Sequence, residues 1–215
     1  MWLWIAGTLI FGYAIGCLHG SVFAQILSGV NLKETGVKNA GASNATIVLG
    51  KKYGALVAAI DIGKGAVAVL FMRYFAKNAE LPGEIIALLI FLAAAATVIG
   101  HNFPFHMNFN GGKGTATIIG VLPAIDWQVG LIGFALFIIV ALVTDFLVFG
   151  VLMLYVTLIT IAVWAEGYWP VVIAVLLFGI AIWKHIENFQ RMKERSEKRV
   201  SAVFKRNNSK TENPL

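Results

Sequence analysis

Hydrophobic residues run along the chain in seven blocks separated by polar segments. The blocks cover residues 2–27, 54–75, 84–100, 111–125, 128–143, 146–165 and 168–184. A helix of roughly 20 mostly apolar residues crosses a hydrocarbon core of about 30 Å, and the fourth and fifth blocks are short by this measure. The first block has no basic segment before it and stays apolar too long for a cleavable signal peptide, so we expect a retained span. The pattern predicts an all-α integral membrane protein with about seven transmembrane helices.

The positions of Lys and Arg between the blocks predict how the chain lies in the membrane. The loop 31–53 holds four lysines and one glutamate, and the segment from Lys184 onward is rich in Lys and Arg. Because cytoplasmic loops carry an excess of positive charge, we expect both segments in the cytoplasm. An odd number of spans then places the N-terminus outside and the C-terminus in the cytoplasm. The three long polar segments, 29–53, 101–114 and 185–215, would all face the cytoplasm, where we expect the functional site of this multi-pass cell-membrane protein.

Composition supports a membrane protein and narrows its partners. The chain is 59% hydrophobic and 13% charged, whereas soluble domains carry about 25% charged residues. Its net charge of +6 does not indicate a nucleic-acid partner, because nine of the 17 Lys and Arg residues lie between Lys184 and Lys210. The single cysteine, Cys17, excludes an internal disulfide and a Cys-rich metal site. We expect one membrane domain over residues 1–190 and a basic, disordered cytoplasmic tail over 191–215.

Asp61 and Lys64 lie inside the second apolar block, where a charged side chain costs about 2.5–3.5 kcal/mol to insert. Three residues apart, they share one face of a helix. Two interpretations remain open: a mutually neutralising structural pair facing the bundle interior, or a pair that organises a buried polar site.

The segment between the third and fourth blocks has the densest polar chemistry. It reads GHNFPFHMNFNGGKGT over residues 100–115. Consecutive glycines let backbone N–H groups converge on an anion, and a helix N-terminus following them adds to the attraction. Lys113 supplies a full positive charge. The segment is not a Walker A loop, because Gly114 replaces the Ser or Thr that would hold magnesium. It is suited to phosphate, although tight turns alone also explain its glycines.

Two further cytoplasmic segments contain similar polar residues. The first loop contains Asn39, Asn44 and several small residues, which favour a tightly turned backbone rich in donors; a flexible surface loop is the alternative. In the C-terminal segment, His185, Asn188 and Arg191 recur at steps of three and share one helix face. They would either close a site from the cytoplasmic end or lie on a helix attracted to anionic lipid.

These residues favour positioning over covalent catalysis. The chain has no G-x-S-x-G, no H-E-x-x-H and no H-x-x-x-x-D motif, so a serine or cysteine nucleophile is unsupported. What remains is a set of anion-holding groups. Holding two reactants together supplies roughly 7–11 kcal/mol of a barrier, and fixed donors stabilise developing charge.

Taken as a pattern, these motifs resemble the bacterial acyl-phosphate:glycerol-3-phosphate acyltransferase family over nearly the full length. The family motif G-H-x-F-P-x-F-x-x-F-x-G-G-K-G-x-A-T is matched at Gly100, His101, Phe103, Pro104, Phe109, Gly111, Gly112, Lys113, Gly114, Ala116 and Thr117. D-x-x-K-G is matched at Asp61, Lys64 and Gly65, and H-x-E-N-x-x-R at His185, Glu187, Asn188 and Arg191. The first family motif in chain order, G-S-x-P followed by D-x-R-x-x-G-S-G-N-x-G-A-T-N-x-x-R, is matched at Gly20, Ser21, Gly36, Asn39, Gly41, Ala42 and Asn44.

The resemblance implies transfer of a fatty acyl group from acyl phosphate to glycerol 3-phosphate, giving lysophosphatidate and phosphate for phospholipid synthesis. It implies a multi-pass membrane enzyme that uses membrane lipids, no metal, cofactor or acyl carrier, and an upstream enzyme that forms acyl phosphate. The implied catalytic residues are Lys113, His101 and Lys64. The implied substrate-binding groups are Gly111, Gly112, Gly114, Asn39, Asn44, Ser21, Asp61, His185, Asn188 and Arg191, with His101 the candidate general base.

The first motif also departs from the family pattern. Val37 stands in place of Ser and Ile47 in place of Arg, so a hydroxyl and a fork-shaped cation suited to phosphate are missing. These departures keep an alternative open: a non-catalytic family member that binds or transports a phosphorylated lipid or anion.

Overall fold

The computed structural model describes residues 1–202, and these residues form helices and loops without a strand. The α-helices are α1 (Trp2–Cys17), α2 (Gly20–Ser28), α3 (Ala42–Leu49), α4 (Lys51–Asn78), α5 (Gly83–Asn102), α6 (Thr115–Ile125), α7 (Trp127–Thr144), α8 (Leu147–Trp164), α9 (Trp169–Lys184) and α10 (Ile186–Lys193). A short 3₁₀ helix, η1, covers Phe105–Met107. The prediction of an all-α fold is confirmed.

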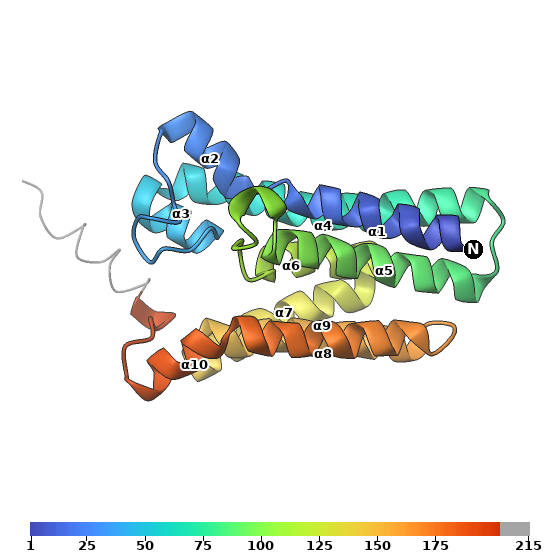
Figure 1. The fold of residues 1–215 in the computed structure, drawn as a ribbon. Helices are drawn as coiled ribbons and strands as arrows, with labels where there is room; N and C mark the ends of the chain where they lie inside the picture. The colour runs from blue at the N-terminus through green and yellow to red at the C-terminus, as the bar shows by residue number, and fades with distance from the viewer. Residues whose placement is uncertain (203–215) are drawn as a thin grey trace, which may run out of the picture.

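The long helices lie side by side, and the polar segments gather at one end of the bundle (Figure 1). That end holds α2, α3, the loop between α5 and α6, and α10. The N-terminus and the short connections α4–α5 and α8–α9 lie at the opposite end. The polar segments 29–53 and 101–114 and the described part of the third, residues 185–202, therefore share one end. That this end faces the cytoplasm stays a prediction from the distribution of Lys and Arg.

Within residues 1–202, five segments are long and apolar enough to cross a membrane: Trp2–Ser28, Lys51–Asn78, Gly83–Met107, Trp127–Thr144 and Leu147–Trp164. A sixth is added if α9 and α10, which are bent by 43° at their junction, count as one span. The predicted block 111–125 differs most from the structure. Its helix, α6, starts only at Thr115 and has 11 residues, which makes it about 17 Å long, because the glycine-containing loop takes up the start of the block. The count of seven spans stays a prediction.

Glycines bring the backbones of α1 and α5 into direct contact. A Cβ on Gly16 would lie 2.3 Å from the Thr97 carbonyl oxygen, and one on Gly100 would lie 2.4 Å from the Tyr13 carbonyl oxygen. Small residues permit such close crossings between membrane helices. As a result, the end of α5, with His101, lies against the end of α1.

A similar crossing joins α4 to α6. Cβ atoms built on Gly65 and Gly120 would lie 2.3 Å from the Thr117 carbonyl oxygen and 1.9 Å from the Ile62 carbonyl oxygen. The start of α6 is therefore held close to the part of α4 that carries the charged pair of the second block.

The chain turns between α6 and α7 with its polar groups partnered. The carboxylate of Asp126 accepts hydrogen bonds from the N–H groups of Gln128 and Val129 and so caps α7. Arg73 of α4 donates to the carbonyl oxygen of Ile125, the last residue of α6. A helix end left without partners would be costly in an apolar environment, so these contacts allow the short α6 to end where it does.

The predicted tail begins inside a helix. Helix α10 runs across the boundary at 190/191 to Lys193, and residues 194–202 follow it with contacts described below. Residues 203–215, the rest of the expected disordered tail, lie outside the described part of the chain.

Candidate active site

The glycine loop after α5 is held by the end of that helix. The N–H of Gly111 donates to the Asn102 carbonyl oxygen at 3.1 Å, and the N–H of Gly112 donates to the His101 carbonyl oxygen at 3.1 Å. A Cβ on Gly111 would lie 2.1 Å from that same His101 oxygen, and one on Gly112 would lie 2.1 Å from His101 Nε2. These glycines are needed for close packing, and their own N–H groups are already bonded.

The free donors of the loop lie one step further along the chain. Gly114 has φ of 84°, in the left-handed region, and is the N-cap of α6. Among the described residues, the N–H groups of Lys113, Thr115 and Ala116 have no backbone partner. First-turn N–H groups at a helix N-terminus attract anions. The donors suited to an anion therefore lie at Lys113 and at the start of α6.

The side chain of Lys113 is directed at α10. Its Nζ donates to Asn188 Oδ1 at 2.5 Å and lies 3.9 Å from Glu187 Oε2. Glu197, beyond α10, accepts from Asn188 Nδ2 at 2.6 Å and from Arg191 Nε at 2.6 Å. The structure thus brings Lys113, Asn188 and Arg191 together, as their motifs predicted. Glu197 was missed, because it lies in the segment assigned to a disordered tail.

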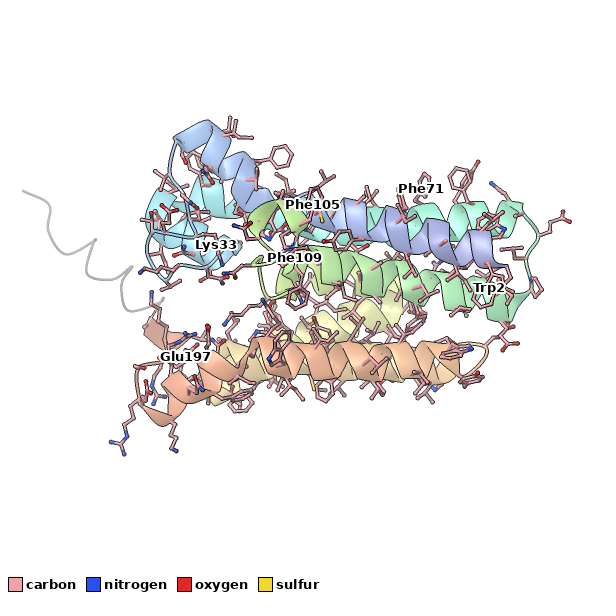
Figure 2. All side chains as sticks on the ribbon, in the orientation of Figure 1. Trp2, Lys33, Phe71, Phe105, Phe109 and Glu197 are labelled. Carbon is pink, nitrogen blue, oxygen red and sulfur yellow. The ribbon has the colours of Figure 1, made fainter. Side chains whose placement is uncertain are left out.

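The surroundings of the Lys113 ammonium lower its pKa below the ordinary value for a lysine. Burial is the main cause, and the nearby cation of Arg191 is the next. Burial also lowers the pKa of Lys33, in the loop after α2, and Lys33 Nζ donates to Asn110 Oδ1 at 2.8 Å. Figure 2 shows Lys33 on the α2–α3 side and Glu197 on the α10 side of this end of the bundle. The arrangement concentrates partly desolvated cations, which favours an anionic ligand.

A cavity of about 750 Å³ adjoins this region, between α2 and the segment around η1. Its lining is mixed: Val22 and Ile26 are apolar, whereas Lys33, Asn108 and Asn110 are polar. Lys113 and Arg191, which we call the cation group, do not line the cavity. The cavity therefore lies beside this group.

Asp61 and Lys64 form a buried pair that ties α4 to the junction of α1 and α2. Lys64 Nζ lies 2.9 Å from Asp61 Oδ1 and donates to the carbonyl oxygens of Gly16 at 2.9 Å and Leu18 at 2.8 Å. Asp61 Oδ1 also accepts from the Gly20 N–H at 3.1 Å. The three donors of the ammonium group are therefore all occupied, and Lys64 acts on the fold around the site instead of offering a free charge.

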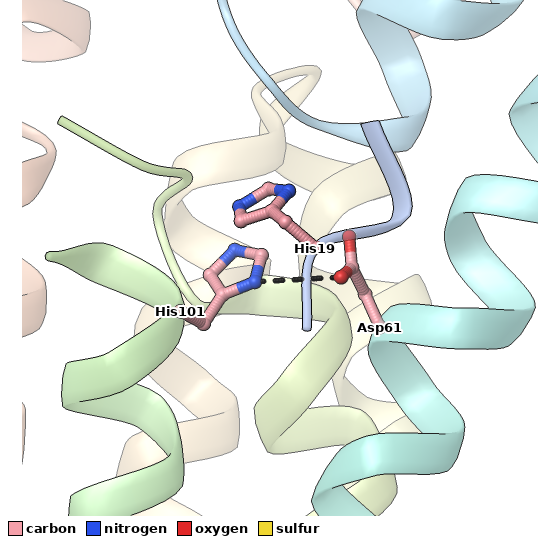
Figure 3. Close-up of side chains that lie close together, drawn as sticks. All are labelled: His19, Asp61 and His101. Atoms are coloured by element: carbon pink, nitrogen blue, oxygen red, sulfur yellow. Dashed lines mark ion pairs between the residues drawn. The ribbon is translucent and has the colours of Figure 1, made fainter. Parts of the chain in front are cut away.

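His19, Asp61 and His101 come together beside this pair (Figure 3). One nitrogen of each ring and one oxygen of Asp61 lie within 4.8 Å of one another, and His101 Nδ1 lies 3.5 Å from Asp61 Oδ1. The three side chains do not suit a metal ion in this arrangement. Lys64 already neutralises the carboxylate, and the rings are stacked at 4.4 Å with 20° between their planes. Lone pairs of imidazole lie in the ring plane, so nearly parallel rings do not aim them at one point.

Asn44 organises the first loop. Its Nδ2 lies within 2.8–2.9 Å of the carbonyl oxygens of Leu32, Thr35 and Asn39, and its Oδ1 accepts from the Val37 N–H at 2.9 Å. Asn44 is fully buried, so its polar groups hold the loop together. Asn39 takes part in this network through its backbone carbonyl. The tight, donor-rich turn expected for this segment thus has a single amide at its centre.

Two more predicted substrate-binding side chains are engaged within the protein. Ser21 Oγ is hydrogen-bonded to His19 Nδ1 at 2.9 Å. His185 Nδ1 lies 2.8 Å from the Ala181 carbonyl oxygen, at the bend between α9 and α10. Both are buried. The spacing of motifs identified positions near the site, but it did not separate residues that face the cation group from residues that hold it in place.

The chain is similar to a known protein family over almost its whole length. A model of the family described as glycerol-3-phosphate acyltransferase matches residues 6–195. A protein of Oceanobacillus iheyensis named glycerol-3-phosphate acyltransferase 1 is 43% identical, with 91% of this chain and 94% of that protein covered. A Deinococcus radiodurans protein of the same name is 32% identical over 89% of this chain and 93% of that protein.

Two solved structures have a similar fold. Both are crystal structures of PlsY (YgiH), described as an integral membrane glycerol 3-phosphate acyltransferase, one in a glycerol 3-phosphate form and one in a lysophosphatidic acid form. They superpose with TM-scores of 0.78 and 0.76, at 28% and 29% identity, and each comparison covers 91% of this chain and 94% of the other.

Proposed function

Because the chain belongs to the glycerol-3-phosphate acyltransferase family, we propose that it transfers a fatty acyl group from acyl phosphate to glycerol 3-phosphate. The products are lysophosphatidate and inorganic phosphate, an early step of phospholipid synthesis. The observation that carries this assignment is the convergence of Lys113, Asn188 and Arg191 at the N-terminus of α6, a place suited to a phosphate group.

The reaction needs positioning and charge stabilisation more than a nucleophilic side chain. A hydroxyl oxygen of glycerol 3-phosphate forms a bond to the acyl carbon, and the bond from that carbon to the phosphate oxygen breaks. The hydroxyl proton passes to a base, and the phosphate leaves with the electron pair. The acyl phosphate is already activated, so fixed cations and donors that stabilise developing negative charge are the main requirement.

In this assignment, Lys113 and the first-turn N–H groups of α6 hold a phosphate group. Asn188 orients the Lys113 ammonium, and Arg191 contributes a second cation from α10. His101 is assigned as the general base. Its Nδ1 faces Asp61 at 3.5 Å and its Nε2 lies against Gly112, so Asp61 orients the ring while Nε2 meets the underside of the loop.

The remaining predicted residues support this site. The α1–α2 junction is held by Lys64 and Ser21, and the first loop by Asn44 and Asn39. The glycine loop is held by Gly111 and Gly112, and the α9–α10 bend by His185. We assign them positioning roles, because each has a polar group engaged in a described contact within the protein, Asn39 through its backbone carbonyl and His185 through Nδ1.

The departures in the first motif affect exposed positions. Val37 and Ile47 are 47% and 40% exposed, so neither side chain has been recruited into the core. Lys33, 2.8 Å from Asn110 on the loop that leads to Lys113, supplies a cation from the same segment. This retained charge supports a competent enzyme.

We also assign the location and partners of the reaction. The distribution of Lys and Arg supports a multi-pass protein of the cytoplasmic membrane with its site on the cytoplasmic side. There the site would receive glycerol 3-phosphate from solution and acyl phosphate from an enzyme that forms it, and would release its product among membrane lipids.

The test is an assay of the purified protein in lipid nanodiscs with different acyl donors. With glycerol 3-phosphate, a long-chain acyl phosphate should give lysophosphatidate, whereas the matching acyl-CoA should not. Lys113→Ala should abolish product. Lys77→Ala, the same substitution in the last turn of α4 and far from the polar end of the bundle, should have no effect. Product from acyl-CoA at the same rate would refute the assigned donor, and equal activity of Lys113→Ala would refute the assigned phosphate site.

A second candidate is a non-catalytic protein that binds or moves a phosphorylated lipid or anion, as the missing hydroxyl and Arg at positions 37 and 47 would allow. Flux of radiolabelled glycerol 3-phosphate into proteoliposomes, without formation of acylated product, would support it. Acyl transfer in the nanodisc assay with no such flux would exclude it.

A further inference from the structure

His19 is a buried side chain that the acyltransferase mechanism does not use. It lies at the N-cap of α2, between α1 and α2, with 1% of its surface exposed. Its Nδ1 is hydrogen-bonded to Ser21 Oγ, and its Nε2 has no hydrogen-bond partner among the described residues. A buried polar atom without a partner costs about 1–3 kcal/mol. An aliphatic side chain would fill the same space without that cost, so the imidazole calls for another explanation.

The explanation lies in what the ring touches. His19 stacks on His101 with 4.4 Å between the ring centroids and 20° between the planes, and Figure 3 shows the two rings beside each other. The rings belong to segments that are about 80 residues apart in the sequence but are joined by the close crossing of α1 and α5. The Ser21 hydrogen bond limits rotation of the His19 ring, so His19 offers His101 a fixed flat surface.

The contact with Asp61 orients Nδ1 of His101 but restrains the tilt of the ring plane less than a stacked ring does. His101 Nδ1 is 3.5 Å from Asp61 Oδ1, longer than a strong hydrogen bond. At the other nitrogen of the ring, Nε2, the neighbour is Gly112, which has no side chain to restrain the ring. Rotation of the ring about its Cβ–Cγ bond would move both nitrogens away from Asp61 and Gly112. Stacking against His19 opposes that rotation.

We propose that His19 is a positioning residue for His101: its Ser21-anchored ring stacks on the His101 imidazole and keeps Nδ1 toward Asp61 and Nε2 toward Gly112. The proposal rests on the assigned role of His101 in acyl transfer. His19 itself touches no reacting atom. Because it acts on the orientation of the base, its loss should lower kcat and leave the KM for glycerol 3-phosphate, which reflects the cation group at Lys113, nearly unchanged.

The test compares three variants in nanodiscs. His19→Leu keeps a similar volume without a planar ring and should lower kcat at least 10-fold, with KM within twofold of the parent. His19→Phe keeps a flat ring without the unpartnered nitrogen and should retain at least one third of the parent kcat. Tyr168→Leu, which removes an exposed ring at the α8–α9 connection at the opposite end of the bundle, is the control and should match the parent. If His19→Leu does not fold, His19→Gln, which also lacks a ring, takes its place.

A second measurement does not depend on activity. Nitrogen NMR of ¹⁵N-histidine-labelled protein should show His101 in one tautomer, with the proton on Nδ1, in the parent and in His19→Phe. The ring-less variant should show a mixture. The proposal is overturned if the ring-less variant has the parent kcat, if His19→Phe is as impaired as that variant, or if the His101 signals do not change. If the parent makes no lysophosphatidate, the proposed function fails, and the NMR comparison still decides the role of His19.

Discussion

Replacing Gly112 with alanine probes the closest contact of the glycine loop. The new Cβ would lie 2.1 Å from His101 Nε2 and 2.8 Å from Cε1 of the same ring, whereas ordinary contacts begin near 3.4 Å. To lengthen the Cβ–Nε2 distance from 2.1 Å to 3.4 Å, the loop or the ring must move by about 1.3 Å. His101 is 3% exposed and has His19 stacked on it, so it has little room to yield.

Overpacking of this size costs about 1–3 kcal/mol of stability, and a displacement of about 1 Å at a reacting group costs about 100-fold in rate. We expect Gly112→Ala to lower kcat about 100-fold and to lower the thermal midpoint measured in detergent. Gly179→Ala is the matched control, because a Cβ there meets nothing within 4 Å, and it should leave both values unchanged.

A double-mutant cycle identifies the clash. His101→Ala removes the ring, so adding Gly112→Ala to it should cause no further loss of thermal midpoint. If Gly112→Ala has the parent kcat and midpoint, or if its effect on the midpoint persists without the His101 ring, the described packing of the loop is wrong.

Three further predictions follow from other contacts. Burial and Arg191 lower the pKa of Lys113 below 10.5, so its ammonium group loses its proton at a lower pH than an ordinary lysine does. Binding of glycerol 3-phosphate should weaken at that same pH. In the parent, kcat/KM should fall as the pH rises through the pKa of Lys113, and Lys113→Arg should move this fall to a higher pH. An identical pH profile of the two proteins would contradict the role of Lys113. Val37→Ser combined with Ile47→Arg should raise kcat/KM for glycerol 3-phosphate several-fold, because both exposed positions gain phosphate-binding groups; an unchanged or lower value would place them away from the substrate. Asp145 accepts hydrogen bonds from the N–H and Oγ of Ser201 at 2.7 and 2.9 Å, so Asp145→Ala should speed amide exchange over residues 194–202, and unchanged exchange would show that the anchor is unimportant.

The helices and their common polar end were predictable because hydropathy and length decide which segments leave water. The glycines also indicated that a helix begins after them, but not at which residue. The sequence block 111–125 holds one charged residue, Lys113, and Gly114 at φ of 84° with the hydrogen bonds from Gly111 and Gly112 sets the start of the helix at Thr115. These are tertiary contacts with α5, which a local pattern does not contain.

The site was predictable at the level of motifs but not of roles. A step of three predicted that Asn188 and Arg191 share one face of α10, but it left open whether that face closes a site. The contact of Asn188 with Lys113 answers that question and comes from the fold, not from the spacing. The motif predicted Asn44 as a substrate-binding residue, and in the structure its side-chain amide contacts four backbone groups of its own loop.

His19 gave no signal in the sequence, because a single histidine beside Gly20 and Ser21 has no partner at helical spacing. Its importance depends on the crossing of α1 and α5, where Gly16 and Gly100 allow the two backbones to touch and bring His101 alongside it. A contact between segments this far apart becomes visible only once the chain is folded.

The most direct test of the central claim follows ¹³C-labelled glycerol 3-phosphate, incubated with a long-chain acyl phosphate and the purified protein in nanodiscs, by mass spectrometry. The account predicts labelled lysophosphatidate that accumulates with one inorganic phosphate released by the protein per molecule formed, and no accumulation with Lys113→Ala. Labelled glycerol 3-phosphate that stays unacylated at the level of the Lys113→Ala control would contradict it.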